Sequence, residues 1–161
     1  MDLQAMVFKL DRYWARQGCA LLPPGSAVTG CRHSLAGAAG RAGHSSDGLE
    51  GFYRYRVSLS PAPAYARRLF LDSLRAAGLD RSEHDLLWLP WEGPGWDVLL
   101  DGLPLARFSY KPSSEGGRAA AAEAELSLER LALAVQRRKT ADSLAWAGRL
   151  TYGELHGGEA A

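Results

Sequence analysis

The clearest alternation of apolar and polar positions in the chain lies in FYRYRVSLS, residues 52–60. A period of two is typical of a strand with one buried face, and the prolines that follow would end it. The polar face of this strand would carry Phe52, Arg54 and Arg56 side by side. The alternating apolar set is Tyr53, Tyr55, Val57 and Leu59.

Two other segments repeat their apolar positions with the period of a helix. Residues 2–17 place Leu, Met, Val, Tyr and Trp side chains on one stripe, and Gly18 ends the pattern. Residues 65–77 carry a second apolar stripe, which Gly78 closes. We expect these stripes to pack against a sheet.

The second half of the chain supplies the remaining predicted elements. HDLLWLP (84–90) predicts a strand, and residues 96–100 and 103–110 predict a hairpin about the favoured turn pair Asp101-Gly102. The segment 118–138 is rich in Ala, Leu and Glu and predicts a long helix from propensity alone.

Length and element order together predict the fold class. The chain has 161 residues, 47% of them hydrophobic, which suits one compact domain with a real core. The element order predicts an α+β domain with helices packed on a mainly antiparallel sheet. Residues 25–51, rich in Gly, Ala and Ser, show no period and are expected to form a long loop, either functional or mobile.

Charge and cysteine usage narrow the function classes. A formal net charge of +1 gives no global field for attracting nucleic acid, so a tRNA contact would need a local basic patch or a partner subunit. Cys19 and Cys31 form no zinc-binding spacing, and a reducing cytosol is the simplest setting, although a bridge between them stays open. The N-terminus lacks a leader pattern, and no apolar run approaches the roughly 20 residues of a membrane span.

Candidate chemistry begins with the aromatic and basic face of residues 52–56. The ring of Phe52 beside the guanidinium groups of Arg54 and Arg56 suits stacking on a base and clamping a phosphate. The simpler interpretation is a solvated sheet face on which arginine stems cover apolar surface.

Two acids and one charged pair extend the candidate set. Glu92 and Asp97 lie near the predicted hairpin, where carboxylates can hold magnesium against nucleotide phosphates; solvated surface acids are the alternative. Arg130 beside Glu129, inside LSLERLALAV, either offers several donors to a phosphate or forms a surface ion pair. The sequence contains neither of the common nucleotide-binding loops, GxxxxGK[ST] or GxGxxG.

Six sequence blocks in a fixed order add a resemblance to these local patterns. They read DRYWARQGC, FYRYRVSLSP, SLRAAGLDRSEHDL, GWDVLLDGLPLARFSY, LERLAL and LTYGEL. In this order they closely resemble the alpha subunit of bacterial heterotetrameric glycyl-tRNA synthetase, a class II aminoacyl-tRNA synthetase. The resemblance implies a single class II catalytic core over residues 1–161, an antiparallel sheet flanked by helices, without the family's C-terminal helical region.

The resemblance also implies an activity and its partners. The family's alpha subunit uses ATP and magnesium to convert glycine to glycyl-adenylate, and its beta subunit carries most of the tRNA recognition. A cytoplasmic homodimer, paired through the N-terminal helix and the following strand and without a membrane contact, is expected.

Site residues follow from the same resemblance, position by position. Phe52 matches the aromatic residue that stacks on adenine. Arg130 matches the motif-3 arginine that contacts ATP, and Glu129 is its family neighbour. The residues that match family groups near the metal or the amino acid are Glu92, Asp97 and His33.

The departures from the family fall on the substrate loops. The glycine-rich loop becomes VTGCRHS (28–34), the arginine-rich motif-2 segment becomes AGRAGHSSDG (39–48), and WENPTLGAWGLGWE becomes WEGPGWD (91–97). FTYFQQ becomes FSYKPS (108–113), and Ser127 replaces the glycine before LER. One lost phosphate-binding arginine can cost on the order of 10²–10³ in rate, so these changes bear directly on activity.

Three functions therefore stay open. The first is a glycyl-tRNA synthetase alpha-like ligase that forms an aminoacyl-adenylate, with Arg54, Arg56 and Arg130 at the nucleotide. The second is a non-catalytic paralogue that keeps the fold as a binding or regulatory module. The third is adenylation with a different amino acid or acceptor, since a fold alone does not fix a reaction.

Overall fold

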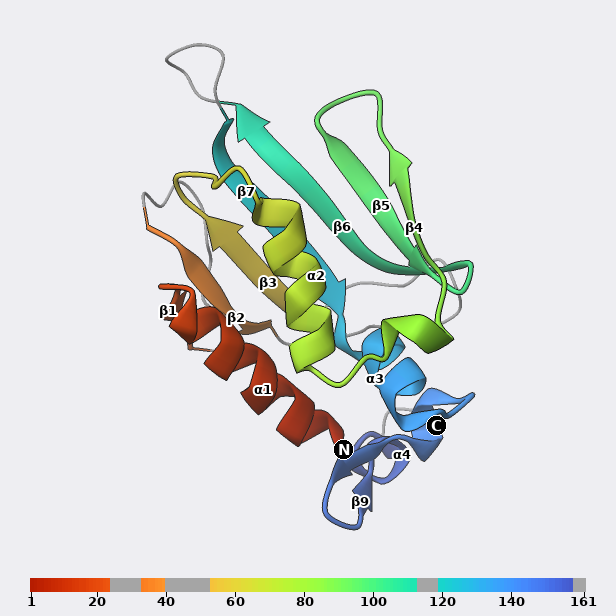
Figure 1. Ribbon diagram of the computed structural model, residues 1–161. Coiled ribbons are helices and arrows are strands. Elements are labelled where there is room, and N and C mark those ends of the chain that lie inside the picture. The colour runs from red at the N-terminus through yellow and green to blue at the C-terminus, as the bar shows by residue number, and fades with distance from the viewer. Residues whose placement is uncertain (24–32, 40–52, 113–118, 158–161) are drawn as a thin grey trace.

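A seven-stranded sheet with the order β1-β2-β3-β7-β6-β5-β4 forms the centre of the structure (Figure 1). The computed structural model describes residues 1–23, 33–39, 53–112 and 119–157. β1 and β2 pair in parallel, and the other neighbouring strands of this sheet pair antiparallel. The strands are β1 (Ala20–Leu21), β2 (Leu35–Ala39), β3 (Arg54–Leu59), β4 (Leu86–Pro90), β5 (Gly95–Leu100), β6 (Leu103–Pro112) and β7 (Ala119–Ser127).

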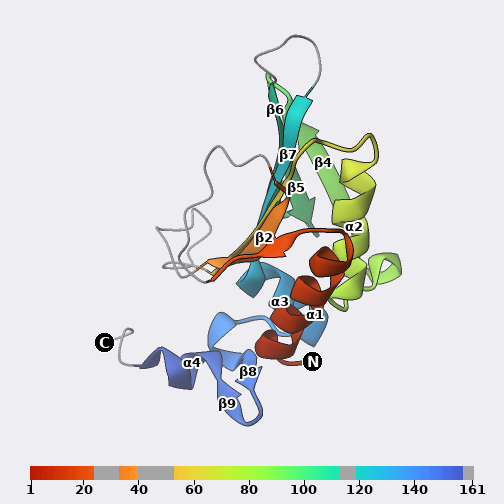
Figure 2. The same cartoon turned by 90° about the vertical axis from the view of Figure 1, so that its left-hand side faces the viewer.

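Two helices cover one face of this sheet. Figure 2 shows α1 (Leu3–Arg16) and α2 (Ala66–Ala76) side by side on that face. At one end of the sheet, α3 (Leu128–Gln136) leads to the hairpin β8 (Ala145–Ala147) and β9 (Leu150–Thr151) and then to α4 (Tyr152–Leu155). We call the sheet face opposite α1 and α2 the open face. This layered arrangement confirms the predicted α+β class.

The strand predicted over residues 52–60 is confirmed as β3, and the two predicted helices are confirmed as α1 and α2. In β3 the side chains of Tyr55, Val57 and Leu59 are buried, whereas Arg56 is exposed. Side chains also tie the layers together, because the Tyr55 hydroxyl donates a hydrogen bond of 2.7 Å to Asp11 of α1. Burial and this carboxylate raise the pKa of Tyr55.

An aromatic cluster fills the core between α2 and the β4–β6 side of the sheet. The ring centroids of Phe70, Trp88 and Phe108 lie 5.7–5.9 Å from one another. The Arg67 guanidinium covers the cluster, 4.5 Å from the centroid of Trp88 and 4.4 Å from that of Trp96. Such cation–π contacts let a charged residue close an apolar core.

The prediction of a long helix over residues 118–138 is wrong for its first half. Residues 119–127 form β7, and only 128–136 form a helix. β7 lies between β3 and β6, so both of its edges make ladder hydrogen bonds, which outweigh the helix propensity of Ala and Glu. Within 122–126 the apolar side chains are buried, and the two glutamates alternate with them on the open face.

In the poorly patterned segment over residues 25–51, the described residues 33–39 contain a strand that the sequence did not predict. Its LAGAA stretch forms β2, which has weak strand propensity but pairs with β3 along its whole length. Cys19, just before β1, is a buried free thiol, and burial raises its pKa to about 11. Cys31 lies outside the described residues. Across the described ranges, no helix is both long and apolar enough to cross a membrane.

The predicted turn between residues 100 and 103 gives a test of the fold. Asp101 and Gly102 adopt φ values of 51° and 83°, which a side chain at position 102 would strain. Gly102→Ala should lower the free energy of unfolding by about 1–2 kcal/mol, measured by urea denaturation. Gly93→Ala is the matched control, because a Cβ there meets open space. Equal stability of the two variants would contradict this turn geometry.

Candidate functional site

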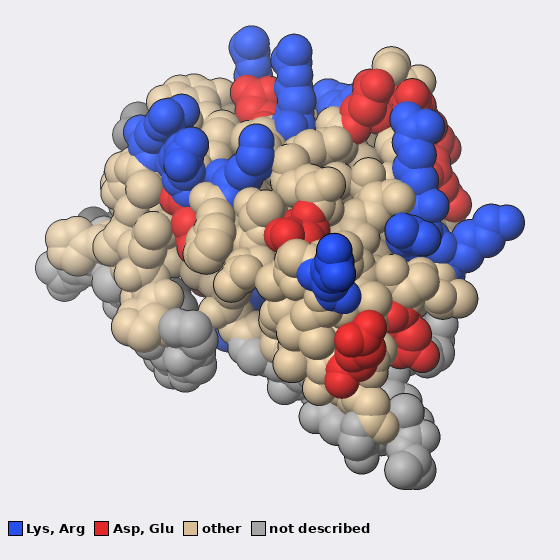
Figure 3. All heavy atoms as spheres, turned by 90° about the horizontal axis from the view of Figure 1, so that it is seen from below, with Lys and Arg blue, Asp and Glu red and all other residues tan. Residues whose placement is uncertain are grey.

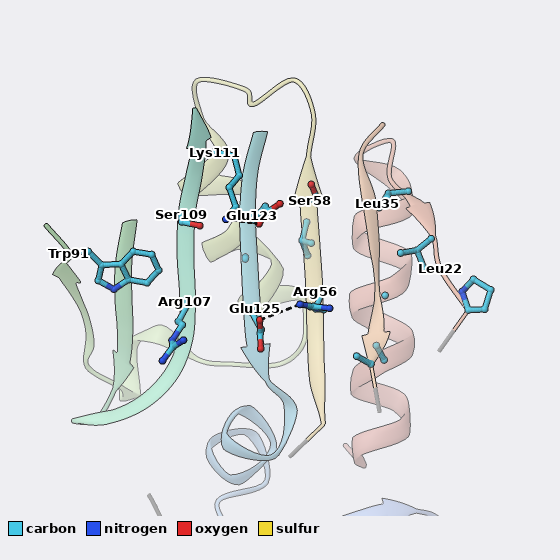
Figure 4. Close-up of a pocket in the computed structure, with 16 residues that line it drawn as sticks. Leu22, Leu35, Arg56, Ser58, Trp91, Arg107, Ser109, Lys111, Glu123 and Glu125 are labelled. Carbon is cyan, nitrogen blue, oxygen red and sulfur yellow. Dashed lines mark ion pairs between the residues drawn. The ribbon is translucent and has the colours of Figure 1, made fainter. Parts of the chain in front are cut away.

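A pocket of about 280 Å³ lies on the open face of the sheet (Figure 4). Leu22 and Pro23, which follow β1, line one end of it, and Trp91 lines the other. A site of this kind suits a small ligand, since it combines a few charged groups with apolar walls. The charged side chains that line it are Arg56, Arg107, Lys111, Glu123 and Glu125.

Strand register sets a charged row on the open face, of which Arg107, Glu125 and Arg56 line the pocket. Asp97, Arg107, Glu125 and Arg56 are direct cross-strand neighbours in that order, from β5 to β3. Opposite charges therefore alternate. Arg56 Nη2 lies 3.8 Å from Glu125 Oε2, and Arg107 Nε lies 3.8 Å from Asp97 Oδ1. Arg54 Nη1 also pairs with Glu125, at 2.5 Å, so one carboxylate orients two arginines.

A second row of shorter side chains runs beside the charged one. Gly95, Ser109, Glu123 and Ser58 are cross-strand neighbours from β5 to β3. Lys111 Nζ lies 3.7 Å from Glu123 Oε2. Ser58 and Ser109 have short side chains that leave space above the sheet, and this space forms part of the pocket.

Glu129, at the beginning of α3, is fully buried and joins three parts of the chain. The backbone N–H of Tyr53 donates to both of its carboxylate oxygens, at 2.8 and 2.9 Å. The Tyr152 hydroxyl donates to Oε2 at 2.9 Å. The N–H of Leu128 in turn donates to the Tyr53 carbonyl, at 3.0 Å. Glu129 is therefore buried and does not lie on the surface, and its carboxylate connects Tyr53, just before β3, with α3 and α4.

His156 completes this network at the C-terminal end. Its Nδ1 lies 2.8 Å from the Tyr152 carbonyl, and its Nε2 lies 2.8 Å from the Tyr53 hydroxyl. A carbonyl only accepts, so Nδ1 carries a hydrogen, and in the neutral imidazole Nε2 would accept one from the Tyr53 hydroxyl. The LTYGEL block that contains Tyr152 is thus connected through Glu129 and His156 to Tyr53, just before β3.

Arg130 lies in the first turn of α3, outside the lining of the pocket. It is half-buried, and this desolvation lowers the pKa of its guanidinium. The Ser127 hydroxyl accepts a hydrogen bond from the Arg130 N–H at 3.2 Å and caps the helix. The serine that replaces the family's glycine therefore has a structural role here. Phe52 lies outside the described residues.

The structure brings together some of the sequence-predicted site residues and leaves others apart. Arg54, Arg56 and Asp97 share the open face. Glu92 lies in the exposed turn between β4 and β5, and His33 is exposed at the bend before β2. Among the described residues, no three His, Cys, Asp or Glu side chains lie close enough to hold a metal ion.

Sequence reasoning missed Glu123, Arg107 and Lys111, which line the pocket. The signal for Glu123 was present, because glutamates alternate with alanine and leucine over residues 121–126. Read as a strand, this segment places both glutamates on one face. Arg107 and Lys111 lie on alternate positions of the predicted strand 103–110 and its extension, which gives them the same face.

Charge on the surface shown in Figure 3 is mixed. Basic and acidic side chains both occur over this side of the molecule, and no single sign covers it. The view agrees with the net charge of +1 and gives this side no broad basic surface for nucleic acid.

Comparison with known proteins identifies the family to which the chain belongs. A family model described as the glycyl-tRNA synthetase alpha subunit matches residues 27–160. The chain belongs to this family. The membership confirms the resemblance drawn from the six sequence blocks and supports an aminoacyl-tRNA synthetase-like function.

Two solved structures with similar folds are pyrrolysyl-tRNA synthetases of Desulfitobacterium hafniense. PylSc is 16% identical with a TM-score of 0.64, and the other is 15% identical with a TM-score of 0.65. Each match covers 94% of this chain and 75% of the compared chain. At such identities the likeness shows the fold alone, and it confirms the predicted class II synthetase architecture.

The hydrogen bond from Tyr152 to Glu129 gives a test of how the site is held together. Tyr152→Phe removes one donor to a buried carboxylate and should lower the free energy of unfolding by about 1–3 kcal/mol, measured by urea denaturation. Tyr65→Phe is the matched control, because Tyr65 is 61% exposed. If both variants were as stable as the parent, the Tyr152–Glu129 hydrogen bond would contribute nothing.

Proposed function

We propose that the protein activates glycine or a related amino acid with ATP, forming an aminoacyl-adenylate for transfer to tRNA. The observation that carries this proposal is the pocket on the open face, with its charged floor, in a chain of the glycyl-tRNA synthetase alpha subunit family. A beta subunit would supply most of the tRNA contact. Cytoplasmic location and a homodimer through α1 and β1 belong to the same proposal.

The charged row suits the chemistry of this reaction. An oxygen of the amino acid carboxylate attacks the α-phosphorus of ATP, the bond to the β-phosphate oxygen breaks, and pyrophosphate leaves. Negative charge grows at the α-phosphate, so prearranged cations stabilise the transition state. Arg56 faces the pocket, and Arg54 shares its partner Glu125, which orients both. Arg130 at the beginning of α3, with Phe52, would bind the adenine end.

Magnesium fits the donor set of the open face. Mg²⁺ is usually held by one or two carboxylates together with substrate phosphates, so a cage of three protein ligands is not required. Glu125 lines the pocket from β7 and offers carboxylate oxygens. Glu92 and Asp97 stay the acids that the family resemblance proposes for this role. When bound, magnesium would neutralise charge on the nucleotide phosphates.

One observation favours the second candidate function, a non-catalytic binding module. The pocket cations already face carboxylates, since Glu125 pairs with two arginines and Glu123 with Lys111. A charge-balanced floor has less net attraction for a nucleotide than unpaired arginines would have. Such a pocket would suit a zwitterionic ligand without any reaction.

ATP–pyrophosphate exchange tests the proposed activity. With glycine, and with a panel of other amino acids, the protein should exchange labelled pyrophosphate into ATP, with or without a beta subunit. Arg56→Ala should lower the exchange rate by about 10²–10³-fold, because it removes a cation from the phosphate site. Arg149→Ala, an exposed arginine near β9, is the matched control and should leave the rate unchanged.

A thermal-shift titration with ATP and magnesium separates the alternatives. Saturable stabilisation without exchange under any condition would contradict the adenylation proposal and favour the binding module. Exchange only with an amino acid other than glycine would support the third candidate, adenylation with a different substrate.

A further inference from the structure

The ring of Trp91 lies directly against the backbone of Gly95. A Cβ atom on Gly95 would lie 2.3 Å from Trp91 Cε3 and 2.5 Å from Cζ3, which no real side chain tolerates. Gly95 also lies in β5 at the end of the row that continues to Ser109. Glycine is therefore the residue that allows an aromatic ring to lie flat on the open face at this point.

Backbone hydrogen bonds fix the turn that carries the Trp91 ring. The Trp91 N–H donates to the Gly95 carbonyl at 2.8 Å, and the Gly95 N–H donates to the Gly93 carbonyl at 2.8 Å. The Tyr110 N–H donates to the Pro94 carbonyl, also at 2.8 Å. Trp91 is still 40% exposed, so the tight turn fixes its position while one side of the ring faces the pocket.

The ring forms one wall of a niche above Ser109. Figure 4 shows Trp91 on one side of Ser109 and Glu123 on the other, and along β6 Arg107 and Lys111 flank Ser109. β5 and β7 are two strand spacings apart, roughly 10 Å. The Trp91 ring lies over Gly95 of β5 at one end of this distance, and the Glu123 side chain lies on β7 at the other. What remains above the serine hydroxyl is narrow.

The groups around the niche match the two ends of a small amino acid. Arg107 and Lys111 suit a carboxylate or the acyl phosphate made from it. Glu123 and the face of the Trp91 ring suit an ammonium group, which both attract electrostatically. Arg107 lies 3.8 Å from its carboxylate partner Asp97, and Lys111 lies 3.7 Å from Glu123. Both distances are long for an ion pair, so a ligand can compete for each cation.

We propose that Trp91, held against Gly95, is a specificity-determining residue that limits the size of the amino acid side chain at this niche. The ring would occupy the space into which a large side chain of the bound amino acid extends, so branched and aromatic side chains would be disfavoured against glycine. The inference rests on the proposed function, because it concerns the amino acid part of the adenylate.

Binding of non-hydrolysable aminoacyl-sulfamoyl adenosines tests the inference without requiring catalysis. The analogues of glycine, alanine, serine, leucine and phenylalanine are titrated by calorimetry against the full chain and its Trp91→Ala variant. The parent should bind the leucine and phenylalanine analogues at least about tenfold more weakly than the glycine analogue. Trp91→Ala should remove that difference.

Two further variants keep the test decisive if Trp91→Ala is poorly folded. Gly95→Ala must displace the ring and should change the ratio of leucine to glycine affinity, whereas Gly93→Ala, in open space, should not. Leu87→Ala, 49% exposed on the same hairpin and outside the pocket lining, should match the parent.

The outcomes separate this inference from the proposed function. An unchanged order of analogue affinities in both Trp91→Ala and Gly95→Ala would overturn the role of Trp91 while leaving adenylate binding intact. Failure of the parent and all variants to bind any analogue would overturn the proposed function, and the inference with it.

Discussion

The buried carboxylate of Glu129 is the constraint on which the arrangement of the site depends. A carboxylate removed from water and left without donors costs about 3–5 kcal/mol, so the fold must bring donors to it. They come from Tyr53, which leads into β3, and from Tyr152, near the end of the described chain. β3, which carries Arg54 and Arg56, and α3, which carries Arg130, are therefore held in a fixed mutual position by one buried acid.

Elements with a strong local signal could be predicted from the sequence. The alternation in β3, the apolar stripes of α1 and α2 and the turn at Asp101-Gly102 each encode their structure within a few residues. Local signals also placed Arg54 and Arg56 on one face, because side-chain direction in a strand follows from parity alone. The two arginines of β3 could thus be predicted to share a face before their surroundings were known, whereas Arg107 on β6 was missed.

Features that depend on distant neighbours could not be predicted in this way. Ala-rich β7 has the composition of a helix, and only pairing with β3 on one side and β6 on the other makes it a strand. The contact of Trp91 with Gly95 depends on the course of a short turn. Glu129 accepts hydrogen bonds from Tyr53 and Tyr152, which lie 76 and 23 residues away in the sequence. No local sequence pattern predicts contacts over such separations. Each of these features is decided by tertiary structure, in which residue type gives only a weak preference.

The position of β7 has a consequence for how the sheet is assembled. Residues up to Leu59 supply β1, β2 and β3, and residues 86–112 supply β4, β5 and β6, yet these two sets share no strand pair. β7 joins them, and it is the last strand of the sheet in the sequence. Until residues 119–127 are available, the two sets of strands cannot be joined into one sheet, and β3 and β6 lack the partner that covers their inner edges. Such edges are sites of unwanted pairing, and a late central strand makes the contacts long-range, so correct assembly depends on the final third of the chain.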